Sequence, residues 1–195
     1  LFYFGNRFKQ DKNKEVVNKI RKIEEKRIEE ITSESTDEGD SSDNSEIQEM
    51  VEVKRNKINE INALKRINPD VIGIIDIPNT QIYYPILQTS NNDYYLNHNI
   101  NNEYDKNGAI YLDYENDYKT SDNLVLYGHN MQNGNMFSDL IRYNEYDYLQ
   151  NNRDIYLYFE DQEYHYKIIS GMFLDLSNNN DFYFNQILDF DKEYN

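Results

Sequence analysis

Candidates for acid–base chemistry are few in this sequence, because it has three histidines and no cysteine. His129 follows a short apolar run, residues 124–127, and Gly128. A histidine at the exit of a buried strand, beside a glycine that allows close backbone approach, is well placed to act at a cleft. His98 lies in a polar loop, and His165 lies in an alternating strand where we expect an exposed side chain. His129 is therefore the candidate catalytic residue, although a loop histidine with no catalytic role would fit the same pattern.

The absence of cysteine excludes several kinds of site from these 195 residues. Disulfides, Cys-ligated zinc, iron–sulfur clusters and a thiol nucleophile all require cysteine. Residues 113–117 resemble the start of a calcium loop, but Tyr118 stands where an EF-hand requires glycine, and no glutamate occupies the twelfth position. This acidic segment could then offer calcium only a loose contact. The sequence also lacks a glycine-rich phosphate loop. We therefore predict no metal site and no cofactor.

Charge is distributed unevenly along the chain. Residues 1–67 contain 14 basic and 15 acidic side chains, whereas residues 68–195 contain 6 and 21. A segment this acidic repels phosphate backbones, which argues against nucleic acid as a partner. No apolar run is long enough to cross a bilayer.

Composition divides the chain into three parts. Residues 1–31 combine basic side chains with apolar residues at helical spacing, which predicts a charged, membrane-proximal helix that acts as a stalk. Its first four residues, LFYF, are either the stub of a membrane anchor or simply an apolar chain end. Residues 32–45 are rich in Ser, Asp and Glu without a large apolar side chain, which predicts a disordered acidic linker. Residues 46–195 have the composition of a folded domain.

The elements expected in this domain are mainly short strands. Apolar residues at helical spacing predict one or two helices up to residue 67, which the dipeptide Asn68-Pro69 ends. Two further short helices are expected at residues 136–142 and 182–194. Runs rich in β-branched and aromatic residues predict six strands, at residues 71–77, 81–88, 109–114, 123–127, 154–160 and 164–173. Six strands with few helices favour a small β-barrel or sandwich.

Six short motifs in this domain, taken together, resemble a class B sortase in their order and spacing. They are NPDVIGIIDIPNT (68–80), YPILQ (84–88), NDYYL (92–96), GAIYLD (108–113), YGHNM (127–131) and GNMF (134–137). The resemblance covers roughly residues 46–195. It implies a mainly β fold: a sortase-like β-barrel, here incomplete, with N-terminal helices and short connecting helices.

The resemblance also implies a function. Sortases are extracellular, membrane-anchored cysteine transpeptidases of Gram-positive bacteria, and class B typically cleaves an NPxTN-type sorting motif in a surface protein. The acyl group is transferred to a cell-wall amine. By this resemblance His129 is the catalytic acid and base, which protonates the leaving amine and then deprotonates the incoming one. Asn92, Leu96 and Asn130 are the predicted substrate-binding residues. The implied partners are a sorting-motif peptide and a cell-wall amine, at the extracellular face of the cell membrane.

The residues that complete the family's site do not occur here. In the family the nucleophile lies in a Thr-Leu-x-Thr-Cys strand, and an arginine that stabilises the oxyanion follows one strand later. The resemblance therefore implies that residues 46–195 are a sortase-like domain that stops before the nucleophile strand, with the membrane anchor missing before residue 1. We expect these residues alone to be inactive. The alternative is a non-catalytic surface protein that binds a sorting motif or another partner.

Overall fold

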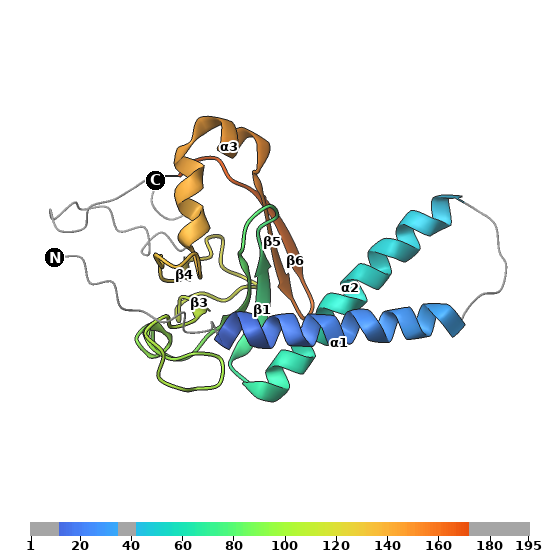
Figure 1. The fold of residues 1–195 in the computed structure, drawn as a ribbon, viewed down its shortest axis with the longest axis horizontal. Helices are drawn as coiled ribbons and strands as arrows, with labels where there is room; N and C mark the ends of the chain where they lie inside the picture. The colour runs from blue at the N-terminus through green and yellow to red at the C-terminus, as the bar shows by residue number, and fades with distance from the viewer. Residues whose placement is uncertain (1–11, 35–41, 172–195) are drawn as a thin grey trace, which may run out of the picture.

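A computed structural model describes residues 12–34 and 42–171, in which two long helices pack against a curled sheet (Figure 1). Helix α1 spans Lys12–Glu34 and helix α2 spans Ser42–Ile67. Shorter helical segments connect the strands: η1 (Tyr94–Leu96), η2 (Ser138–Asn144) and α3 (Tyr146–Asn151). The helix predicted at residues 182–194 lies outside the described residues.

Six strands form a half-barrel in the order β4-β3-β2-β1-β5-β6. All neighbours pair antiparallel except β2 and β3, which are parallel. The strands are β1 (Val71–Asp76), β2 (Tyr83–Leu87), β3 (Ile110–Leu112), β4 (Leu126–Tyr127), β5 (Asp154–Phe159) and β6 (Glu163–Lys167). Each lies within or beside a predicted strand. The prediction of an incomplete β-barrel with N-terminal helices and short connecting helices is confirmed.

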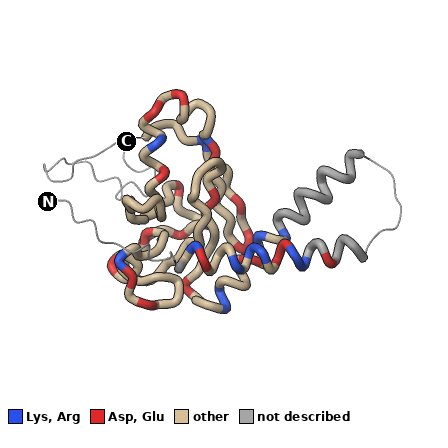
Figure 2. The backbone as a smooth tube through the Cα atoms, viewed as in Figure 1, with Lys and Arg blue, Asp and Glu red and all other residues tan. Residues whose placement is uncertain are grey.

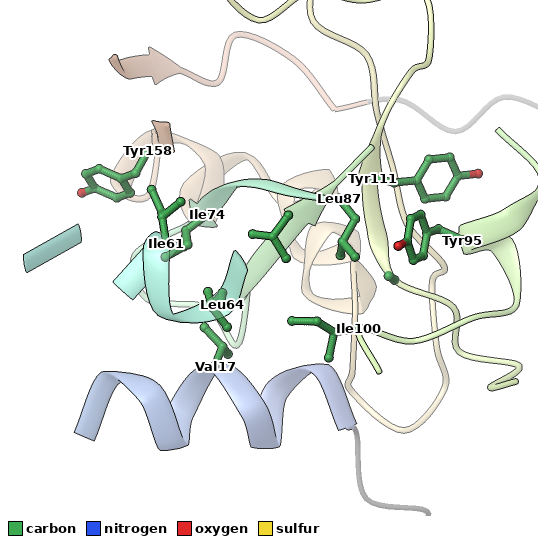
Figure 3. Close-up of a cluster of buried hydrophobic side chains, with 11 residues drawn as sticks. Val17, Ile61, Leu64, Ile74, Leu87, Tyr95, Ile100, Tyr111 and Tyr158 are labelled. Carbon is green, nitrogen blue, oxygen red and sulfur yellow. The ribbon is translucent and has the colours of Figure 1, made fainter. Parts of the chain in front are cut away.

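Two hydrophobic clusters fill the space on either side of the central strands, because β1 and β2 bury residues on both faces. The first cluster joins the helices to the sheet: Val17 of α1 and Leu64 of α2 lie with Ile74 of β1 and Ile100 (Figure 3). The second joins the sheet to η2 and to the loop after β4, with Met136 and Tyr143 among its members. Loops that carry the candidate site are therefore packed on a rigid sheet.

A buried polar network also holds the helices on the sheet. Tyr83 of β2 donates its hydroxyl proton to Glu60 Oε2 at 2.6 Å and accepts a hydrogen bond from Lys57 Nζ at 2.5 Å. The Lys57 ammonium also lies 4.4 Å from the ring centre of Tyr83 and 5.0 Å from that of Tyr158. Glu60 is buried, and this burial raises its pKa despite the hydrogen bond from Tyr83.

Helix α1 differs from the predicted stalk in one respect. Residues 12–31 are helical, as expected for the part that the structure describes, but the helix packs on the folded domain through Val17 and Asn13, both buried. Lysines and arginines of the described residues gather on α1 and α2 (Figure 2). The predicted linker, residues 32–45, overlaps both helices: 32–34 end α1, 42–45 begin α2, and 35–41 lie outside the described residues.

Candidate active site

The loop after β4 carries His129 and is pressed tightly against the sheet. A Cβ atom added to Gly128 would lie 2.3 Å from Ile110 Cδ1 and 2.8 Å from Phe137 Cδ2, so only glycine fits here without displacement. The loop closes on itself, because Phe137 N donates a hydrogen bond to the carbonyl oxygen of His129 at 2.9 Å. The backbone of His129 is therefore fixed by both neighbours of the loop.

The far end of the same loop is held by Met136. This residue is fully buried and has a φ of 56°, in the left-handed region that a side chain of this size seldom adopts. Its amide donates to the hydroxyl of Tyr84 on β2 at 3.0 Å, and its backbone forms an isolated bridge with Asn130. A non-glycine residue in the left-handed region costs about 1–3 kcal/mol, which the burial of Met136 offsets.

The His129 side chain contacts the segment that precedes the third strand. Its Nε2 atom lies 2.8 Å from the carbonyl oxygen of Leu96, the last residue of η1. Because a carbonyl oxygen can only accept, Nε2 carries a proton and donates it. In the neutral imidazole, Nδ1 then carries the lone pair and is the atom that can take up a proton. This hydrogen bond orients the ring and selects the nitrogen available for acid–base work.

The three predicted substrate-binding residues lie in different local settings. Leu96 leaves 42% of its surface exposed, so its apolar side chain is accessible to a ligand beside His129. Asn130 is exposed and next to His129 in the loop. The Asn92 amide is engaged within the protein: it donates to Asp113 Oδ2 at 2.9 Å and accepts from the Tyr114 amide at 3.0 Å. Leu96 thus lies against His129 through its backbone, whereas Asn92 supports the same loop from below β3.

Comparison with known proteins identifies the family. Residues 75–186, more than half of the chain, match the family model described as "Sortase domain". The chain belongs to the sortase family. Its relatives place it with the sortases B: it is 47% identical over 87 residues to sortase B of Listeria monocytogenes, covering 44% of this chain and 35% of that protein. The predicted family is confirmed, and the chain spans about a third of the length of that curated relative.

Solved structures agree with this assignment. A Bacillus anthracis protein described as similar to sortase B superposes with a TM-score of 0.59 at 28% identity, over 89% of this sortase chain and 78% of that chain. Staphylococcus aureus sortase B, solved with a triglycine peptide, superposes with a TM-score of 0.56 at 28% identity, over 61% and 57% of the two chains. The same S. aureus enzyme, solved as a substrate complex, gives a TM-score of 0.55 at 28% identity, over 60% and 56%.

Asp113 is a residue of this sortase site to which sequence reasoning assigned no role. It directly follows β3, is 3% exposed, and accepts hydrogen bonds from Asn92 Nδ2, from the Tyr127 hydroxyl at 2.7 Å and from the Glu115 amide at 2.9 Å. Burial and this hydrogen bond raise the pKa of Tyr127, so the phenol stays protonated and donates. Asp113 therefore ties the Asn92 loop to β4, two residues before His129. The only sequence signal was an acidic residue that ends an apolar strand.

Among the residues that the structure describes, no three His, Asp or Glu side chains are arranged to hold a metal ion. The acidic segment 113–117 instead uses its carboxylates for local hydrogen bonds: Asp117 accepts from the Lys119 amide at 2.9 Å and from the Thr120 hydroxyl at 3.0 Å. Within the same described ranges, no helix is both long enough and apolar enough to cross a membrane.

Proposed function

We propose that these residues form the histidine side and one groove wall of a class B sortase that cleaves an NPxTN-type sorting motif in surface proteins and joins them to the cell wall. The observation that carries this proposal is the hydrogen bond from His129 Nε2 to the Leu96 carbonyl. It leaves Nδ1 as the proton-exchanging atom next to an exposed apolar side chain, Leu96.

In the proposed reaction a cysteine thiolate attacks the scissile carbonyl after the threonine of the motif, giving a thioester and releasing an amine. His129 Nδ1 gives a proton to that amine. An incoming cell-wall amine then attacks the thioester, His129 takes its proton, and the thiolate leaves as a new amide bond forms. The triglycine found with S. aureus sortase B has the free amine that this second step requires. We place the reaction at the extracellular face of the cell membrane.

The thiol is the one participant that these residues cannot supply, because the sequence has no cysteine. We therefore expect the 195 residues alone to bind a sorting-motif peptide without cleaving it. This expectation also keeps the second candidate function in view, a surface protein that binds a sorting motif but performs no transfer.

The test has two arms. In the first, the chain is incubated with a fluorogenic NPxTN-type peptide, and we expect binding without turnover. In the second, the matched segment of L. monocytogenes sortase B is replaced by the corresponding segment of this chain, which provides a thiol in the same molecule. We expect turnover there, and a loss of about 10²–10⁴-fold in His129→Ala.

His165→Ala is the matched control, because His165 lies on β6 and contacts Asp154 rather than the loop after β4. Turnover by the chain alone, abolished in His129→Ala, would show that the thiol is dispensable and the mechanism wrong. A chimera that turns over equally well in wild-type and His129→Ala forms would remove the histidine from the mechanism. A folded chimera without turnover would favour the non-catalytic alternative.

A further inference from the structure

Asn13, in the first turn of α1, makes contacts that a stalk helix would not need. Its side chain is 1% exposed and spans two backbone groups of the loop between η1 and β3. Nδ2 donates to the carbonyl oxygen of Gly108 at 2.9 Å, and Oδ1 accepts from the amide of Ile100 at 2.8 Å. These partners are 95 and 87 residues away along the chain. A single amide thus joins the N-terminal helix to this loop.

The loop is in turn joined to η1 at the point where His129 is held. Gly108 has a φ of 60°, and a Cβ atom there would lie 2.4 Å from the Tyr95 carbonyl oxygen and 2.6 Å from that of Leu96. The next amide, that of Ala109, donates to the Tyr95 oxygen at 2.9 Å. The Leu96 carbonyl, which receives the His129 Nε2 proton, therefore packs directly against the residue that Asn13 holds.

We propose that Asn13 is a positioning residue of the active site, which sets the Leu96 carbonyl and through it the orientation of His129. This inference rests on the proposed function in giving His129 the proton-transfer step. The contacts form a continuous path: Asn13 to Gly108, Gly108 to Leu96, and Leu96 to His129. Helix α1 is then part of the site and not a spacer in front of it.

The amide side chain suits this role because it both donates and accepts. The Ile100 amide and the Gly108 carbonyl are both buried, and buried backbone groups are nearly always paired. Aspartate at this position would still accept from Ile100 but would bring a carboxylate against the Gly108 oxygen. Alanine would remove both partners. Asn13→Asp and Asn13→Ala therefore form a graded pair that separates the two hydrogen bonds.

The experiment uses nuclear magnetic resonance on the full chain labelled with ¹⁵N. With three histidines, the ring signals can be assigned by replacing His98 and His165 in turn. The two readouts are the Nε2 proton signal of His129, which a hydrogen bond to a carbonyl protects from exchange with water, and the amide exchange rate of Ile100. Neither needs peptide or turnover, so failure of this inference is distinguishable from failure of the proposed function.

The matched control is Ile20→Ala, which removes apolar contact between α1 and the helix–sheet cluster without touching the loop. In Asn13→Ala we expect the His129 Nε2 proton signal to broaden or vanish and Ile100 to exchange at least about tenfold faster. Asn13→Asp should shift the His129 signal while leaving Ile100 largely protected. Ile20→Ala should lower the melting temperature with both signals kept.

Two results would overturn the inference. One is faster Ile100 exchange in Asn13→Ala with an unchanged His129 Nε2 signal, which would show that the loop contact does not reach the histidine. The other is the same change of the His129 signal in Ile20→Ala, which would reduce Asn13 to one of many residues that dock α1. If Asn13→Ala does not fold, Asn13→Asp decides: an unaltered His129 signal in that folded variant overturns the inference as well.

Discussion

Replacing Gly128 with alanine tests how the loop that carries His129 is held. The new Cβ would lie 2.3 Å from Ile110 Cδ1 and 2.8 Å and 2.9 Å from two ring carbons of Phe137. Carbon atoms in favourable contact are about 3.5–4.0 Å apart, so the Ile110 methyl group must move by more than about 1 Å. Ile110 is 1% exposed, which leaves its side chain no solvent-filled space to enter. Either the core repacks or the loop lifts and takes His129 with it.

The size of the effect follows from two opposing contributions. Overpacking of this kind typically costs about 1–3 kcal/mol. Alanine also restricts the unfolded chain more than glycine does, which returns about 0.4–1 kcal/mol. We therefore expect Gly128→Ala to lower the free energy of unfolding by about 1–2 kcal/mol. Ile110→Val removes the clashing methyl group and alone costs about 0.5–1.5 kcal/mol. On the Gly128→Ala background its cost should disappear, giving a coupling of about 1 kcal/mol.

The assay is urea unfolding followed by circular dichroism for the wild type, both single variants and the double variant. Gly134→Ala is the matched control, because that glycine has a φ of 84° and no atom within 4 Å of the added Cβ. It should lose stability through backbone strain alone, without coupling to Ile110. Equal costs for Ile110→Val with glycine or alanine at position 128 would refute the steric argument, as would a Gly128→Ala variant as stable as wild type.

Two further predictions concern buried carboxylates. Asp113→Asn should lower the free energy of unfolding by about 1–3 kcal/mol, because its amide cannot accept from both Asn92 and Tyr127; urea unfolding at neutral pH measures this, and an unchanged midpoint would contradict it. Burial raises the pKa of Glu60 above 4.5 despite the hydrogen bond from Tyr83, so the folded state binds more protons than the unfolded state. The stability of wild type relative to Glu60→Gln should therefore fall as the pH rises from below 4.5 through the raised pKa; a flat or rising difference across a urea series in pH would oppose this.

The strands of this domain were predictable because their local signals are strong. Residues 71–77 and 81–88 are runs of β-branched and aromatic side chains bounded by turn-forming residues, and β1 and β2 lie inside them. The position of His129 was equally accessible, since it follows an apolar strand and a glycine. Both inferences use residues that are neighbours in sequence, where propensity and steric limits act directly.

The docking of α1 and the ends of the linker were not predictable in the same way. A charged helix with a narrow apolar stripe gives no indication that Asn13 meets backbone groups 87 and 95 residues away. The linker shows a different difficulty. Ser, Asp and Asn are common in disordered segments and are also favoured at the starts of helices, so residues 42–45 satisfy both rules. Helix α2 in fact begins at residue 42.

The geometry around His129 also explains how a chain that spans about a third of its curated relative can still define half of a catalytic site. Every group that orients the imidazole lies between residues 13 and 137: the Leu96 carbonyl, the loop held by Asn13, the packing around Gly128 and the anchor at Met136. None of these contacts involves the thiol. Binding and proton transfer on one side, and nucleophilic attack on the other, are therefore separable in structure, so a chimera that supplies the thiol can test the histidine side alone.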